Sequence, residues 1–191
     1  GVEMASMIAT GEVSSREVVD AHLDRIHEVN GHCNAVTRVL ADEARAGADK
    51  ADAAVAAGDT LGPFHGVPCT IKENIDVAGT PTTQGLPAFA DLVSPVDAPV
   101  VERLRAAGAI PVGRTNLPEL GLRISTDNPL HGLTRNPWHP DLTAGGSSGG
   151  EGSAIASGMS PLGLGNDIGG SVRNPAFCCG ITSIKPTHGR L

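Results

Sequence analysis

Apolar positions in the first third of the chain recur at helical spacing. Ser14 and Glu17 have the spacing of a capping box, and apolar residues then recur every three or four positions until Asn30-Gly31. The Ala-rich run 41–57 has high helical propensity and is followed by Gly58, which is typical of a helix end. The pattern therefore predicts one amphipathic helix from Ser14 to about residue 30, and a second helix over 41–57.

The pattern changes after residue 63, where short apolar runs alternate with helical signals. Residues 67–71 are apolar and β-prone and predict a strand that ends at Lys72. Asp97 as N-cap, Pro99 in the first turn and Gly108 beyond the end predict a helix, which is followed by a strand over 110–112.

Later elements continue the alternation after a turn-rich loop over 128–146. The predicted elements are a helix over 150–157, a strand over 161–164, a short helix from Ser171 and a strand over 181–184. Alternating helices and strands indicate a layered α/β fold. No internal repeat or linker divides the chain, so one domain is expected.

Composition narrows the classes of function. The chain has 191 residues, of which 40% are hydrophobic, enough for the core of one domain. Three Phe, one Trp, no Tyr and a net charge of -7 argue against stacking on bases and against phosphate backbones or anionic membranes. No apolar stretch approaches the length needed to cross a bilayer, so we expect no membrane segment and a cytoplasmic location.

The sequence indicates neither a metal site nor a cofactor site. The four cysteines contain no C-x-x-C pair and are expected to be reduced and mostly buried: Cys33, Cys69, Cys178 and Cys179. His27 and His32 are one residue too far apart for a zinc-protease motif. No glycine-rich phosphate loop of a nucleotide-binding protein is present. We therefore expect no metal and no organic cofactor.

Two glycine clusters carry the candidate chemistry. The first, 145–152, would alone be typical of a flexible linker. The second, 163–170, contains strand and helix signals and leads directly into Ser171. Successive glycines before a helix allow N–H groups to converge on one anionic oxygen, which favours Ser171 as a nucleophile rather than a simple helix cap. The N–H groups expected to form this oxyanion hole belong to Ile168, Gly169 and Gly170.

Several of these segments together resemble the amidase signature family. Residues 145–190 closely resemble its signature segment, and 66–74, which contain Ile71-Lys72-Glu73, resemble its lysine strand. Further similar segments are 15–36, 113–119 and 134–138. The resemblance implies the amidase signature fold, a mixed twisted β-sheet sandwiched between α-helical layers. It also implies that residues 1–191 form a single amidase domain, the amino-terminal half with the catalytic signature, with the carboxy-terminal half of the family apparently absent.

The family's Ser-Ser-Lys triad maps onto Lys72, Ser147 and Ser171. In the mechanism that the resemblance implies, neutral Lys72 accepts a proton through Ser147 while Ser171 attacks the amide carbonyl, and water later hydrolyses the acyl-enzyme. The pKa of Lys72 must then fall below the usual value of about 10.4. The resemblance also implies a cis peptide bond between Gly146 and Ser147.

Other residues of the signature receive supporting roles from the resemblance. Asp167 and Arg173 are expected to pair and fix the shape of the nucleophile loop, and Ser148 to hydrogen-bond within the relay or cap the following helix. Departures from the family pattern are Glu73 where Asp is commoner, Glu151 where Ser is commoner, and Phe177-Cys178 before the expected Cys179.

The resulting hypothesis is an amidase that hydrolyses a carboxylic amide to an acid plus ammonia or an amine. The expected partner is a small-molecule amide substrate, and no direct contact with nucleic acid is expected. Assembly into a homodimer is left open. The alternatives are a glutamine-hydrolysing subunit of a tRNA-dependent amidotransferase, and an inactive fragment or scaffold that needs its missing half.

A serine esterase is a weaker alternative. Residues 146–150 fit G-x-S-x-G, with Asp167 and His188 following in α/β-hydrolase order. Residues 138–144 contain two helix and strand breakers, however, and lack the strand that such a nucleophile requires.

Overall fold

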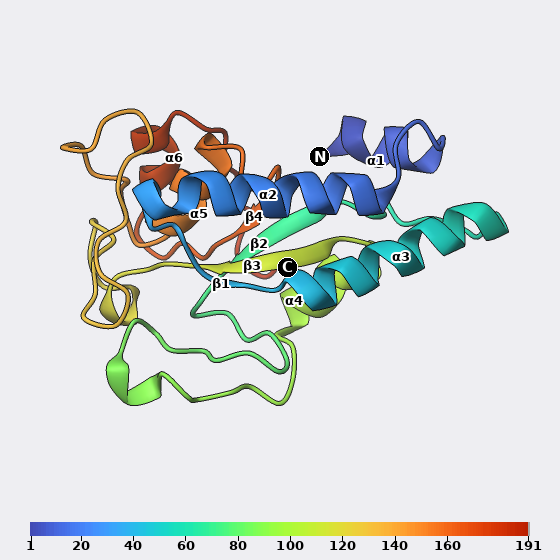
Figure 1. Ribbon diagram of the computed structural model, residues 1–191. Coiled ribbons are helices and arrows are strands. Elements are labelled where there is room, and N and C mark those ends of the chain that lie inside the picture. The colour runs from blue at the N-terminus through green and yellow to red at the C-terminus, as the bar shows by residue number, and fades with distance from the viewer. Residues whose placement is uncertain (191) are drawn as a thin grey trace.

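The computed structural model describes residues 1–190 and contains a mixed four-stranded sheet with helices on both faces (Figure 1). Strand β3 is antiparallel to β1, and β2 is parallel to both β3 and β4, in the order β1-β3-β2-β4. In chain order the elements are α1 (Val2–Ala9), α2 (Ser15–Cys33), β1 (Val36–Val39), α3 (Ala41–Ala57), β2 (Pro68–Lys72), the 3₁₀ turn η1 (Pro87–Phe89), α4 (Pro99–Ala106), β3 (Ile110–Thr115), the 3₁₀ turn η2 (Glu119–Gly121), α5 (Gly149–Ala156), β4 (Gly163–Leu164) and α6 (Arg173–Cys179). The α/β class with a mixed sheet is confirmed.

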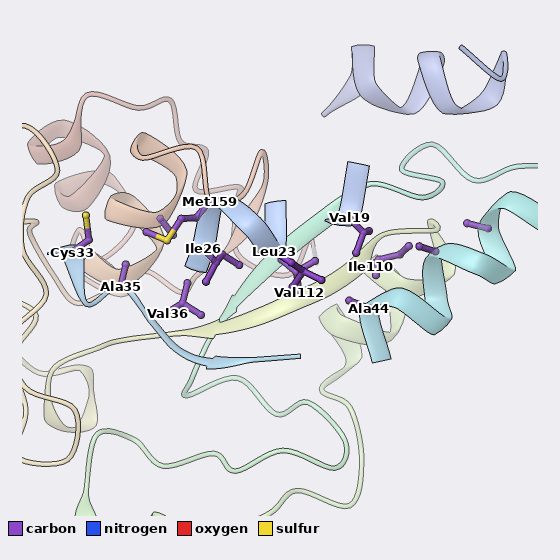
Figure 2. Packing of buried hydrophobic residues seen from close by; sticks show 13 residues of the cluster. Val19, Leu23, Ile26, Cys33, Ala35, Val36, Ala44, Ile110, Val112 and Met159 are labelled. Atoms are coloured by element: carbon purple, nitrogen blue, oxygen red, sulfur yellow. The ribbon is translucent and has the colours of Figure 1, made fainter. Parts of the chain in front are cut away.

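The main hydrophobic core lies between one face of the sheet and helices α2, α3 and α5. Figure 2 shows Leu23 of α2 against Val112 of β3, and Ile26 of α2 on the side of Val36 of β1. The apolar stripe that predicted α2 is therefore the stripe that the sheet buries. A second cluster joins Ile71 of β2 to α4 on the opposite face, so the predicted sandwich of a sheet between helices is confirmed.

Helix α2 begins as predicted but ends later. The capping box is present, yet the helix continues through Asn30-Gly31 to Cys33. The Asn30 side chain accepts a hydrogen bond from the N–H of Val36 (2.8 Å) and donates one to its carbonyl (2.8 Å). Asn30 therefore ties the helix to the start of β1, and the chain turns only at Asn34, whose φ of 51° is left-handed.

Helix α4 begins one residue later than predicted, with Ala98 as its N-cap. The prediction of Asp97 as N-cap was wrong because that carboxylate is used elsewhere. It accepts a hydrogen bond from the N–H of Ala78 (2.8 Å) and pairs with Arg105 (2.9 Å). Asp97 thus joins the loop after β2 to the last turn of α4.

The predicted strand over 181–184 is absent from the part of the chain that the structure describes. Helix α6 ends at Gly180 in a left-handed conformation, and the N–H of Ile181 still bonds back to Ala176 (3.0 Å). The following residues form no ladder, and Ile184 is largely exposed. The helix from Ser171 also begins later, at Arg173.

One helix and one strand had no prediction, nor did the two 3₁₀ turns. Strand β1 has only Val36 fully buried, so its four residues lack a clear alternating pattern. Helix α1 places Ala5 and Ile8 against Val67 and Val18 in a small separate cluster.

Candidate active site

Lys72 is the last residue of β2 and lies at the centre of the candidate site. Every residue of this strand is buried, and the Lys72 side chain is fully inaccessible. Its Nζ donates hydrogen bonds to Oγ of Ser147 (2.7 Å) and to Oδ1 of Asn166 (2.7 Å). The predicted pair of Lys72 and Ser147 is therefore in direct contact.

Burial lowers the pKa of Lys72 to about 8, because removing the ammonium from water disfavours the charged form. The carboxylates of Glu151 and Asp167 act in the opposite direction and raise it. A neutral amine is consequently accessible near neutral pH, which a general base requires.

Ser147 lies in the first glycine cluster, after a cis peptide bond with Gly146. Its side chain is buried. A Cβ at position 146 would come within 2.6 Å of the carbonyl oxygen of Arg123, and one at position 121 within 3.3 Å of Ser147 Oγ. Gly146, which precedes Ser147 in the chain, and Gly121, which lies against its hydroxyl, therefore make space for the backbone and side chain of Ser147.

Asp167 and Arg173 clamp the loop that carries Ser171. Arg173 donates through Nη2 to Oδ1 (2.9 Å) and through Nε to Oδ2 (3.0 Å) of Asp167. The carboxylate also accepts from the N–H groups of Gly170 (2.7 Å) and Val172 (3.1 Å). The bond from Arg173, followed by these backbone donors, holds the pKa of Asp167 well below its usual range. The predicted pairing is present in the structure.

The three candidate oxyanion donors differ in availability. Ile168 is fully exposed, and within residues 1–190 neither its N–H nor that of Gly169 makes a hydrogen bond. The N–H of Gly170 is already bound to Asp167 Oδ1. Two of the three predicted donors are therefore free to receive an anionic oxygen in this conformation.

Ser171 is partly buried and lies beside the first glycine cluster through its backbone. Its carbonyl accepts the N–H of Ser148 (3.0 Å). Among the described residues no hydrogen bond joins the hydroxyls of Ser171 and Ser147. Ser148 is the N-cap residue of α5, but its side chain makes no capping bond and instead contacts the carbonyl of Asn166 (3.5 Å).

Asn166 is the contact that the sequence reasoning missed. In addition to accepting from Lys72, it donates through Nδ2 to Oδ1 of Asn74 (3.2 Å). Its position between Gly165 and Asp167 in the second glycine cluster was the only available signal. A neutral amide can accept from Lys72 without adding charge to the site.

Arg114 of β3 fixes the end of the lysine strand from the other face of the sheet. It is fully buried and donates to the carbonyls of Lys72 (3.3 Å) and Ile75 (2.6 Å), as well as to the hydroxyl of Thr80. Burial lowers the pKa of Arg114 to about 10. The guanidinium satisfies backbone carbonyls where β2 ends and the chain turns.

A cleft of about 950 Å³ opens beside these groups, between β4, α4 and residues 181–189. Ser148, Glu151 and Asn166 line it on the side of the candidate site. The esterase alternative gains no support, because Asp167 binds Arg173 and the exposed His188 makes no hydrogen bond with it.

No group of three His, Cys, Asp or Glu side chains within 1–190 is placed to hold a metal ion. No helix in that range has the length and apolar character needed to span a bilayer.

A family model described as Amidase matches residues 17–191. The chain belongs to the amidase family. An indoleacetamide hydrolase of Bradyrhizobium diazoefficiens is 55% identical over 190 residues, which cover 100% of this chain and 36% of that protein. One subunit of the glutamyl-tRNA(Gln) amidotransferase from a Synechococcus species is 44% identical, covering 99% of this chain and 39% of that protein.

The fold agrees with this assignment. A solved bacterial aryl acylamidase of the amidase signature family superposes with a TM-score of 0.86 at 35% identity, covering 90% of this chain and 36% of that chain. The amidase signature fold is thereby confirmed. The chain spans well under half the length of the curated relatives named above.

Proposed function

We propose that this chain carries the catalytic groups of an amidase that hydrolyses a carboxylic amide to an acid plus ammonia or an amine. The observation that carries the proposal is the 2.7 Å contact between the buried Nζ of Lys72 and Oγ of Ser147. A lysine whose pKa is lowered to about 8 and which contacts a serine hydroxyl is suited to act as a base.

In the proposed reaction neutral Lys72 takes the proton of Ser147, which takes that of Ser171 as Ser171 Oγ bonds to the amide carbon. The carbonyl oxygen becomes an anion that the N–H groups of Ile168 and Gly169 receive. Gly170 joins them only if its bond to Asp167 opens. The relay then returns the proton to the departing nitrogen as the C–N bond breaks, and water hydrolyses the resulting ester.

Ser147 and Ser171 must come into hydrogen-bonding contact for this relay, and two contacts of the neighbouring residues support it. Ser147 is held by Lys72, while the backbone of Ser171 is tied to the neighbouring Ser148 at 3.0 Å. The Ser171 side chain makes no hydrogen bond of its own within residues 1–190, so no existing bond has to break for it to join the relay.

Two substrates follow from the relatives. The indoleacetamide hydrolase, at 55% identity, favours a primary amide of an arylacetic acid. The amidotransferase subunits, at 42% to 46% identity, favour glutamine as a source of ammonia. Ammonia release from indole-3-acetamide and from glutamine distinguishes the two, and release from glutamine alone would favour the second.

The test of the nucleophile is labelling of the 191-residue chain with a fluorophosphonate, followed by peptide mass spectrometry. We expect an adduct at Ser171, loss of the adduct in Ser171→Ala, and strongly slowed labelling in Lys72→Ala. His188→Ala should label at the wild-type rate. An adduct at any other serine would contradict the assignment, and no labelling would favour the alternative of an inactive portion that needs the rest of the domain.

Three further points stay predictions. Residues 1–191 are proposed to be the amino-terminal half of one amidase domain. A cytoplasmic location is supported by the free thiols of all four cysteines, since reducing compartments keep thiols unpaired. A homodimer would be tested by sedimentation.

A further inference from the structure

Glu151 is a buried carboxylate that the proposed mechanism does not use. It lies in the first turn of α5, and its side chain is directed onto the sheet. Oε2 accepts the hydroxyl of Thr70 in β2 (2.6 Å), and Oε1 accepts that of Thr115 in β3 (2.7 Å). A Cβ at position 163 in β4 would lie 2.1 Å from Oε2, so the glycine there is needed to make room for the carboxylate. Three neighbouring strands therefore form a cradle for it.

The cradle places this carboxylate on the same face of the sheet as Lys72. Thr70 precedes Lys72 by two residues in β2, so both side chains project from one face. Thr115 is the register partner of Lys72 in β3. No ion pair within 4 Å joins Glu151 and Lys72 among the described residues. The two groups are therefore not an ion pair in contact, although they share one face of the sheet.

We propose that Glu151 is the buried countercharge that opposes the effect of burial on the Lys72 ammonium, and thereby shifts the pH range over which Lys72 serves as a base. Glu151 is thus a positioning residue and touches no reacting atom. Only its consequence for hydrolysis rests on the proposed function, through the role of Lys72 as base.

Other charges near Lys72 are compensated or point elsewhere. The carboxylate of Asp167 is paired with Arg173 at 2.9 Å. Arg114 contacts the carbonyl of Lys72 from the opposite face. Cys69 lies in the same strand, and burial raises the pKa of its thiol, so that it stays neutral. Of the two carboxylates that raise the pKa of Lys72, Glu151 is the one with hydroxyl partners only and no cation in contact.

The two groups oppose each other electrostatically. Burial raises the pKa of Glu151 to about 7, while the two threonine hydroxyls and the charge of Lys72 lower it. The carboxylate in turn raises the pKa of Lys72 against the effect of burial. Removing the carboxylate should therefore lower the pKa of Lys72 further.

The test measures the Lys72 titration directly, by NMR of the protein labelled with ¹³C at the lysine ε-carbon, with Lys72→Met to assign the signal. Glu151→Gln keeps the shape of the side chain and removes the charge, and we expect the Lys72 midpoint to fall by about one pH unit. Glu151→Asp keeps the charge and should leave the midpoint closer to wild type. An unchanged midpoint in Glu151→Gln would overturn the proposal.

Two further variants provide a control and a substitute for Glu151→Gln. Glu73→Gln is the matched control, because Glu73 follows Lys72 directly but contacts His131 (2.9 Å) and not the cradle. It should leave the Lys72 midpoint in place, and a shift equal to that of Glu151→Gln would overturn the proposal. Thr115→Val removes one hydroxyl that stabilises the carboxylate, so it should lower the midpoint in the same direction by less. This variant serves if Glu151→Gln does not fold.

The pH dependence of hydrolysis, compared with the NMR midpoint, distinguishes failure of this inference from failure of the proposed function. If Lys72 is the base, the acidic limb of the pH–rate profile should move down with the NMR midpoint in Glu151→Gln. A moved midpoint with an unmoved limb would support the role of Glu151 and count against Lys72 as base. An active variant with an unmoved midpoint would refute the role of Glu151 alone.

Discussion

Replacing Lys72 by Met should remove the base and at the same time stabilise the fold near neutral pH. Burial brings the pKa of Lys72 from 10.5 to about 8. At about 1.4 kcal/mol per pH unit, holding the buried ammonium costs about 3 kcal/mol below pH 8. That pKa already includes the attraction of Glu151, so only loss of the bonds to Ser147 and Asn166 offsets the gain, by about 1–2 kcal/mol. Lys72→Met should therefore gain about 1–2 kcal/mol in the free energy of unfolding at about pH 7.

The stability gained by Lys72→Met should depend on pH. Between pH 8 and 10.5 the unfolded chain keeps the proton on Lys72 while the folded chain has lost it, so wild-type stability rises with pH in this interval. The advantage of the Met variant should therefore shrink from about pH 7 to pH 10.5, and reverse where only the lost hydrogen bonds remain. Urea unfolding at both pH values measures it.

Lys50→Met is the matched control, because Lys50 is exposed on α3 and the same side chain is removed there. Its effect should stay within about 0.5 kcal/mol at both pH values. A Lys72 variant less stable than wild type near neutral pH, or an advantage that is the same at pH 10.5, would refute the reasoning.

Three further predictions concern the glycine clusters and the clamp. Ser147→Ala should slow the release of ammonia from the preferred amide by orders of magnitude while the thermal midpoint falls only by the loss of one buried hydrogen bond, and wild-type turnover would exclude Ser147 from the relay. Gly150→Ala should destabilise the chain by about 2–3 kcal/mol in urea unfolding, because the added Cβ would lie 2.4 Å from the backbone N of residue 116. Gly31→Ala on the open side of α2 has nothing within 4 Å and should be neutral or stabilising, so equal effects would contradict this view. Arg173→Gln should raise the pKa of Asp167 and slow fluorophosphonate labelling, whereas Arg173→Lys should retain part of the rate.

Local signals in the sequence predicted the elements whose ends are set by their own residues. Helix α3 ends at Gly58 because that residue adopts the left-handed conformation. Lys72 comes at the end of a buried strand as its apolar neighbours indicated. The end of α2 could not be predicted in this way, because the Asn30 side chain binds the backbone beyond the helix rather than ending it.

Side-chain partners distant in sequence were the part that the pattern could not supply. Lys72 and Asn166 are 94 positions apart, and Thr70 and Glu151 are 81 apart. The pairing of β2 with β4 brings Asn166 to Lys72, and the packing of α5 on β2 brings Glu151 to Thr70. The triad residues were predicted through resemblance to the amidase signature family, and their neighbours Asn166 and Glu151 received no role there.

The glycine cluster that resembles a linker lies in a closely packed part of the chain. Residues 144–154 are all buried, and an added Cβ would approach other atoms within 3 Å at positions 145, 146, 149 and 150. Composition alone suggests that this stretch is a flexible linker and safe to diversify in directed evolution, and its packing shows the opposite. Libraries that diversify this low-complexity stretch should consist almost entirely of inactive members, whereas substitutions of the exposed apolar side chains Leu122 and Ile124 should meet no such clashes.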